Sequence, residues 1–210
     1  HSFFKDKYGL GQRALFNVLR AYAKFNETTG YVQGMGFIAA LLLTYMDEES
    51  TFWMIHCLMV DYNLKGYYVK GFPELNRSYY KLLSLMKKHI PKIYEHFRKE
   101  GVLPTMYACQ WFISLYSVVF SFDILVRIFD IFLLEGDKIL YRMALAVFKY
   151  NEDRLLKAKH FDQIMGMMRS LYDNMTVDEV MTYAYKFSIA KAHLAVIDYN
   201  NRSMIKHLRR

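Results

Sequence analysis

The residues best suited to chemistry in this sequence form the stretch Tyr31-Val32-Gln33-Gly34-Met35. Gln33 cannot act as a nucleophile or as a proton-transferring base, but its side-chain amide carries both donors and an acceptor. Such an amide can hold a water molecule in a fixed orientation. Phosphoryl-transfer sites use a glutamine in this way, to place the attacking water in line with a γ-phosphate. Gln33 is therefore chemically able to orient a water molecule.

Two helices are expected to hold this stretch in place. Apolar residues recur at helical spacing over Leu10–Phe25, and residues 36–46 are almost wholly apolar, as in a helix enclosed by others. A polar loop between two buried helices can aim one side chain at a partner. Gly30 and Gly34 predict tight backbone geometry there, or a close approach by the partner. From these residues alone, the favoured interpretation is that Gln33 is a loop residue that hydrogen-bonds its own backbone.

The motif and its surroundings resemble the YxQGM signature of TBC domains, which are GTPase-activating domains for Rab-type small GTPases. Further blocks in the family's order extend the resemblance over roughly the first 150 residues, which makes chance similarity improbable. These blocks are Phe3-Phe4-Lys5 with Gly11-Gln12 and residues 15–22, residues 106–112, and residues 127–136.

The resemblance implies an all-α, irregular multi-helix globular domain of the TBC RabGAP type. It implies that Gln33 is the catalytic finger, supplied in trans to the GTPase. Gly34 and Met35 would support that finger or face the GTPase. Tyr31 would do the same, although an aromatic side chain that simply anchors the loop explains much of its presence.

Three other residues match a structural signature of the family. Trp111 begins an aromatic stripe that is most simply core packing, and Arg127 and Asp130 belong to the last matching block. Because Arg127 and Asp130 lie three apart on one expected helix, they can pair locally. We therefore expect all three to maintain the fold rather than to contact the GTPase.

Nucleotide chemistry is expected to belong to the partner. The chain has no G-x-x-x-x-G-K-[ST] motif, so it is not expected to be a GTPase itself. The resemblance implies that a Rab-family GTPase in its GTP-bound state holds both GTP and Mg²⁺. We expect no cofactor and no metal site in this chain.

One departure from the family concerns its arginine finger. The family carries this arginine in an IxxDxxR motif shortly before the segment that begins here at His1. Arg13 and Arg20 do not replace it, because both fall inside the expected helix Leu10–Phe25. We expect the sequence to be a fragment with the motif upstream, the alternative being a natural relative that lost the arginine. The fragment should then bind a Rab GTPase but accelerate hydrolysis poorly.

Composition leaves two other function classes open. The formal charge of +8 favours acidic partners, but the basic residues are scattered and form no nucleic-acid-type block. A non-catalytic module that binds GTP-bound Rab is one alternative, and a basic helical scaffold at membranes is the other. Charges interrupt the apolar region 111–134, so we expect no transmembrane segment. Cys57 and Cys109 indicate free thiols in a reducing compartment, and hence a cytoplasmic protein, peripheral on endomembranes at most.

The remaining patterns predict helices and no strands. Helices are expected over residues 51–62, from Pro91, over two segments of 111–134, over Lys138–Tyr150, and after a Thr176–Glu179 capping box. Residues 63–76 are expected to be mainly loop. Residues 1–155 would form the TBC portion with the finger motif, and residues 156–210 a C-terminal helical part of the same domain.

Overall fold

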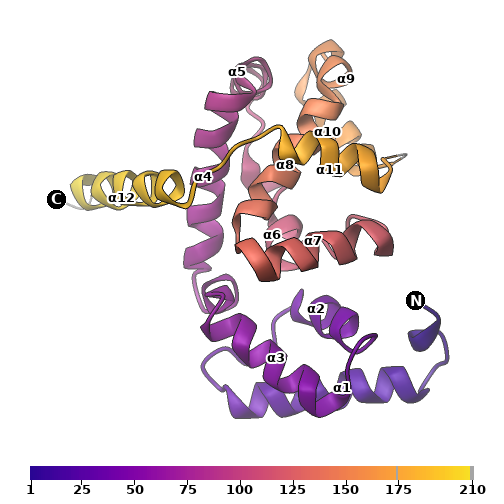
Figure 1. The fold of residues 1–210 in the computed structure, drawn as a ribbon. Helices are drawn as coiled ribbons and strands as arrows, with labels where there is room; N and C mark the ends of the chain where they lie inside the picture. The colour runs from indigo at the N-terminus through magenta and orange to yellow at the C-terminus, as the bar shows by residue number, and fades with distance from the viewer. Residues whose placement is uncertain (174, 209–210) are drawn as a thin grey trace.

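A computed structural model describes residues 1–173 and 175–208, and within those ranges the chain forms helices and no strand. The all-α expectation is confirmed. Figure 1 shows the α-helices around a central α8, with the two ends of the chain far apart. In chain order the elements are η1 (Ser2–Phe4), α1 (Leu10–Phe25), α2 (Met35–Leu42), α3 (Glu48–Val60), η2 (Leu64–Tyr67), α4 (Pro73–His89), α5 (Pro91–Lys99), η3 (Pro104–Met106), α6 (Cys109–Ile113), α7 (Phe122–Glu135), α8 (Lys138–Tyr150), α9 (Glu152–Lys157), α10 (Phe161–Met167), η4 (Met168–Ser170), α11 (Val177–Tyr185) and α12 (Lys191–Leu208).

The first three helices pack against one another at the bottom of Figure 1. Helix α1 has the predicted bounds, and its buried face carries Ala14, Val18 and Tyr22 at helical spacing. Helix α3 is capped by Asp47, whose carboxylate accepts the amide hydrogen of Ser50. This short-range cap fixes how the chain passes from the connection after α2 into α3.

Proline starts both helices of the next pair. Pro91 opens α5, as predicted, because a proline fits the first helical turn without losing a hydrogen bond. Pro73 opens α4 by the same rule, so the predicted loop over residues 63–76 extends too far. A short 3-10 helix, η2, lies within that loop region.

The apolar region 111–134 departs from the two core helices that were predicted. Its second helix, α7, exists, but α6 ends at Ile113. Leu115 and Tyr116 have φ values of 48° and 66°, so the backbone turns left-handed and cannot continue the helix. The buried Tyr116 hydroxyl donates to the carbonyl of Leu140 at 2.8 Å, which holds this turn against α8.

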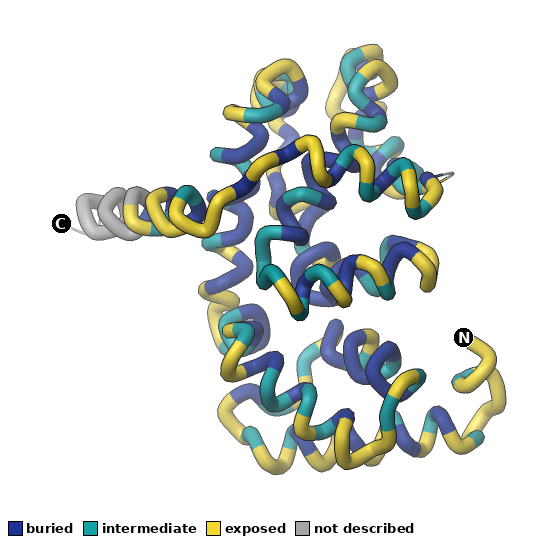
Figure 2. The backbone as a smooth tube through the Cα atoms, viewed as in Figure 1, coloured by how far each residue is buried: buried dark blue, intermediate teal, exposed yellow. Residues whose placement is uncertain are grey.

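Helix α8 lies at the centre of the core. Most of its residues are fully buried, as the dark segments in Figure 2 show, and α4, α7 and α11 pack around it. Its bounds are those predicted. Packing of this mostly apolar surface stabilises the helix, which has no side-chain cap at its start.

The C-terminal part packs on this core through two helices. The predicted capping box forms at the start of α11, where the Thr176 hydroxyl accepts the Glu179 amide hydrogen and the Glu179 carboxylate reaches back. Helix α11 lies along α8, and Arg142 of α8 donates from Nε to the Phe187 carbonyl at 3.2 Å. Helix α12 packs on α4 and then projects away from the body (Figure 1). Across the described ranges, no helix combines the length and the apolar character needed to cross a membrane.

Candidate functional site

The loop that joins α1 to α2 is tied down by Asn26. The backbone carbonyl of Asn26 accepts from Thr29 at 3.1 Å and from Gly30 at 2.8 Å. Its side chain accepts from the Thr29 amide and donates to the hydroxyl of the fully buried Tyr22. The chain then passes Gly30 in a left-handed conformation, with φ of +60° and open space around it. A short turn held by its own hydrogen bonds therefore precedes Gln33 in the chain.

Gln33 sits exposed immediately before α2. Val32 and Met35 close the turn around it, because the Met35 amide donates to the Val32 carbonyl at 3.2 Å. Among the hydrogen bonds of the described residues, none uses the Gln33 side chain. The interpretation that Gln33 bonds its own backbone is therefore not what the structure displays. Its amide is free to meet a partner beside the positive end of α2.

Tyr31 is exposed but lies against α1. With Phe16, Leu19, Arg20 and Ala23 it lines an apolar hollow of about 250 Å³. Its hydroxyl oxygen lies 3.5 Å from the position that a Cβ on Gly36 would occupy. The ring therefore supports the loop from the α1 side, as an anchor would.

Gly34 and Met35 face inward. Gly34 caps α2 with φ of +111°, and a Cβ at this position would lie only 2.9 Å from the Ile113 carbonyl oxygen. Met35 is 2 % exposed and packs in the core. Of the two expected roles, support of the finger and contact with the GTPase, the burial of Gly34 and Met35 fits support of the loop from behind. Tyr31 and Gln33 form the surface of the loop.

The three signature residues divide into one core residue and two surface residues. Trp111 is 1 % exposed and stacks on Tyr116 with ring centroids 5.7 Å apart. Arg127 and Asp130 are exposed on α7, and the ion pairs found between described residues do not include them. The buried face of α7 carries Ile128 and its neighbours, which turns positions 127 and 130 toward solvent. The expected local ion pair between Arg127 and Asp130 is therefore not among those of the described residues, and their role in maintaining the fold stays a prediction.

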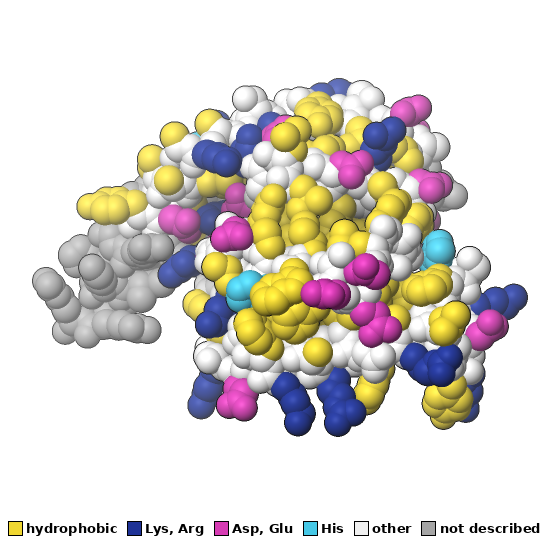
Figure 3. Space-filling model, turned by 60° about the horizontal axis from the view of Figure 1, so that its bottom comes forward, with side chains coloured by type: hydrophobic (Ala, Val, Ile, Leu, Met, Phe, Trp, Pro, Cys, Tyr) yellow, Lys and Arg dark blue, Asp and Glu magenta, His cyan; other side chains and the backbone are white. Residues whose placement is uncertain are grey.

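Apolar side chains are exposed on the α1–α3 face. Figure 3 turns this face forward and shows hydrophobic side chains gathered at its middle with acidic side chains beside them, and lysines and arginines mainly toward the edges. Phe16, Phe25 and Trp53 are each more than half exposed there, and the Phe25 and Trp53 rings meet edge to face at 6.1 Å. Exposed apolar surface of this kind is typical of a binding face.

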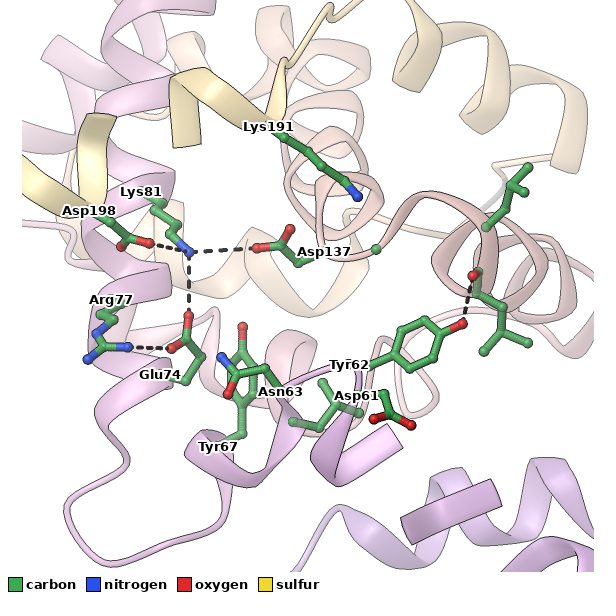
Figure 4. A pocket seen from close by; sticks show the side chains of 14 residues that line it. Asp61, Tyr62, Asn63, Tyr67, Glu74, Arg77, Lys81, Asp137, Lys191 and Asp198 are labelled. Carbon is green, nitrogen blue, oxygen red and sulfur yellow. Dashed lines mark hydrogen bonds and ion pairs between the residues drawn. The ribbon is translucent and has the colours of Figure 1, made fainter. Parts of the chain in front are cut away.

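A charged cavity of about 500 Å³ lies elsewhere, between α4, the α7–α8 turn and α12. Figure 4 shows the Lys81 ammonium between three carboxylates from these elements, with Arg77 beside one of them. The Lys81 Nζ distances are 3.2 Å to Asp198, 3.4 Å to Glu74 and 3.6 Å to Asp137. Burial lowers the pKa of Lys81, but the three carboxylates outweigh it and leave that pKa raised. The cluster joins α12 to the body, and no residue of the α1–α2 loop lines it.

Two residues that support the loop carried no signal in the sequence. Tyr68 donates its hydroxyl to the Ile113 carbonyl at 2.6 Å, and both residues are buried. Neither belongs to a recognisable motif, and they lie 45 residues apart. Only the folded chain brings them together behind Gly34.

Comparison with known proteins gives consistent matches. The family model described as Rab-GTPase-TBC domain matches residues 1–156. The human "Ecotropic viral integration site 5 protein homolog" is 33% identical over 98% of this chain and 24% of its own length. Mouse "TBC1 domain family member 4" is 29% identical over 95% of this chain and 16% of its own. The chain thus spans a quarter or less of these relatives.

Two solved structures share the fold. The crystal structure of the Chlamydomonas flagellar RabGAP TBC domain has a TM-score of 0.75 and 30% identity, covering 88% of this chain and 61% of that one. The Ypt/Rab-GAP domain of Gyp1p has a TM-score of 0.69 and 19% identity, covering 90% of this chain and 66% of that one. The second match bears on the fold alone.

Proposed function

Because this chain belongs to the Rab-GTPase-TBC domain family, we propose that it activates GTP hydrolysis by a Rab-type small GTPase. The GTPase would be engaged in its GTP-bound state and would hold GTP and Mg²⁺ itself. The chain would supply groups in trans and bind no nucleotide. Its site of action would be the cytoplasmic side of an endomembrane, reached through the membrane-bound partner.

The observation that carries this proposal is the Gln33 side chain. It is exposed, it has no hydrogen-bond partner among the described residues, and it stands on a loop fixed by Asn26 and Gly34. A fixed amide with free donors and a free acceptor suits one task well, which is to orient a water molecule.

In the mechanism we propose, the Gln33 carbonyl oxygen accepts a hydrogen bond from the attacking water. Its amide nitrogen donates to an oxygen of the γ-phosphoryl group. The water attacks phosphorus, the bond to the GDP oxygen breaks, and the proton of the water passes to the released phosphate. Gln33 gains and loses no proton, which is consistent with the chemistry of an amide.

An arginine would complete such a site by neutralising charge on the phosphates. Residues 1–210 contain no IxxDxxR motif, and we propose that this group is supplied from outside them. A finger arginine contributes about 10³ to 10⁵ in rate. We therefore propose that the 210-residue chain binds its GTPase well and activates it weakly, and that an added IxxDxxR segment of the family raises the activity.

The test is single-turnover GTP hydrolysis across a panel of purified Rab GTPases, with and without that added segment. Three variants run beside the wild type. Gln33→Ala removes the amide, Gln33→Glu keeps its shape but loses both donors, and Gln110→Ala removes another exposed glutamine, which lies on α6. Activation lost in both Gln33 variants and kept in the Gln110 variant supports the proposal. Unchanged activation by Gln33→Ala refutes the assigned role.

The absent motif favours one other function, a non-catalytic module that recognises the GTP-bound form. It predicts equal hydrolysis rates with and without the chain, even after the IxxDxxR segment is added. Binding measured against GTP-loaded and GDP-loaded GTPase would then be the only readout that responds. A membrane scaffold predicts salt-sensitive binding to anionic vesicles that needs no GTPase.

A further inference from the structure

We propose that Tyr68 is a positioning residue for the Gln33 loop. Its buried hydroxyl holds the Ile113 carbonyl, and that carbonyl sets the position of Gly34, the residue that follows Gln33. The inference rests on the proposed function for its catalytic consequence, but the positioning itself can be tested without a GTPase.

The first link is the hydrogen bond between Tyr68 and Ile113. At 2.6 Å it is short, and the Tyr68 side chain is 3 % exposed, so water does not compete for the carbonyl. Burial raises the pKa of Tyr68 well above its usual range, which keeps the phenol protonated as a donor. The bond connects the segment after η2 to the last residue of α6.

The Ile113 carbonyl depends on that donor. It ends α6, and the chain turns away directly afterwards, so the helix does not continue to satisfy it. The next three backbone amides donate to other carbonyls of this helix, those of Gln110, Phe112 and Trp111. Removing the Tyr68 hydroxyl would leave a buried acceptor free to rotate toward another partner.

The second link is the contact between this carbonyl and Gly34. The Ile113 oxygen lies 2.9 Å from where a Gly34 Cβ would be, and Ile113 Cγ2 lies 3.2 Å from the same point. The carbonyl therefore occupies the space that a side chain would fill. With φ of +111°, Gly34 has an unusual backbone conformation, which this packing supports together with the hydrogen bond that the Gly34 carbonyl accepts from the Phe37 amide at 3.2 Å.

The consequence for Gln33 follows from the covalent chain. A shift of the Ile113 carbonyl lets the Gly34 peptide move, and the Gln33 side chain moves with it. Positioning errors of about 1 Å in a catalytic group can cost about 100-fold in rate. Loss of the Tyr68 hydroxyl should therefore reduce the maximal rate more than it reduces binding.

Tyr68→Phe tests this in the 210-residue chain, because it removes the hydroxyl and keeps the ring. The matched control is Tyr62→Phe, since the Tyr62 hydroxyl also donates to a backbone carbonyl, that of Leu133, at 2.8 Å in the charged cavity. Hydrogen exchange of the amides in residues 31–37 reports the loop, and titration of the chain into a responsive GTPase separates maximal rate from half-saturation.

We expect Tyr68→Phe to speed exchange in residues 31–37 about 10-fold or more, and Tyr62→Phe to leave it unchanged. The maximal rate should fall about 10-fold with half-saturation changed less than about 3-fold. Exchange equal to wild type in Tyr68→Phe overturns the inference. If the wild-type chain activates no GTPase even behind an added IxxDxxR segment, the proposed function fails in its catalytic part, and the exchange experiment still decides the positioning role.

Discussion

Gly34→Ala is the substitution for which the structure gives the clearest magnitude. An alanine at φ of +111° adopts a strained backbone, at a cost of about 1 to 3 kcal/mol. Its Cβ would also meet the Ile113 oxygen at 2.9 Å, and such overpacking costs about 1 to 3 kcal/mol more. We expect the free energy of unfolding to fall by roughly 2 to 6 kcal/mol. The Tm of a domain of this size would drop by roughly 5 to 20 °C.

Gly30→Ala is the matched control, because Gly30 lies in the same loop with φ of +60° and nothing within 4 Å of its added Cβ. Only backbone strain remains there, about 1 to 2 kcal/mol. Urea unfolding of both variants gives the comparison. The contact with Ile113 is real if Gly34→Ala costs at least about 1 kcal/mol more than Gly30→Ala. Equal costs for the two variants would refute the reasoning.

A double-mutant cycle extends this test to the carbonyl itself. If the Tyr68 hydroxyl holds the Ile113 carbonyl in place, Tyr68→Phe frees that carbonyl to move away from an alanine at position 34. The double variant should then lose less stability than the two single variants together, by about 0.5 kcal/mol or more. Strict additivity would mean that the carbonyl does not respond to the hydroxyl.

Two further predictions concern the C-terminal part. Lys81→Met leaves three carboxylates without their shared ammonium. We expect the free energy of unfolding, measured in urea, to fall by about 3 to 5 kcal/mol and hydrogen exchange in α12 to become faster. Unchanged exchange would contradict the role of this cluster in joining α12 to the body. Burial, with help from Lys88 and His193, lowers the pKa of His89, so the unfolded chain binds a proton at His89 more readily than the folded chain does. Stability should therefore fall as pH drops below about 6.5, and His89→Asn should flatten the slope of unfolding free energy against pH in that range.

Local chemistry made much of the fold predictable. The bounds of α1 and α8 follow from their apolar periodicity, Pro91 starts α5, and Thr176 and Glu179 form their capping box. Each of these features depends on residues within one or two turns of one another. Sequence patterns read such features well because the interactions are short-range.

Features that depend on distant partners were missed. The apolar residues after Ile113 look helical, yet the backbone turns left-handed at Leu115 and Tyr116, where the Tyr116 hydroxyl finds a carbonyl on α8. No pattern in the sequence around Tyr116 predicts that hydrogen bond. Likewise, Arg127 is exposed because α7 packs on the core through its opposite face, which carries Ile128. The spacing of Arg127 and Asp130 in the sequence does not show which face of the helix is buried.

The candidate site shows the same division. The position of Gln33 on a loop between two helices was predicted, and its exposure is consistent with an outward role. Gly34 was expected to permit tight geometry, which its φ of +111° bears out, but the reason for that geometry is the Ile113 carbonyl behind it. Sequence analysis predicted where Gln33 lies and could not predict what holds its loop in place.

The most direct test of the central claim uses a responsive Rab GTPase whose own water-positioning glutamine is replaced by alanine. Its single-turnover GTP hydrolysis is measured with the chain fused behind an IxxDxxR segment, in wild-type and Gln33→Ala form. If Gln33 orients the water in trans, the wild-type fusion accelerates GTP hydrolysis by this GTPase variant by about 100-fold or more. The Gln33→Ala fusion then binds the GTPase variant without accelerating hydrolysis. Equal acceleration by both forms, or none by either while the unaltered GTPase responds, would contradict the account.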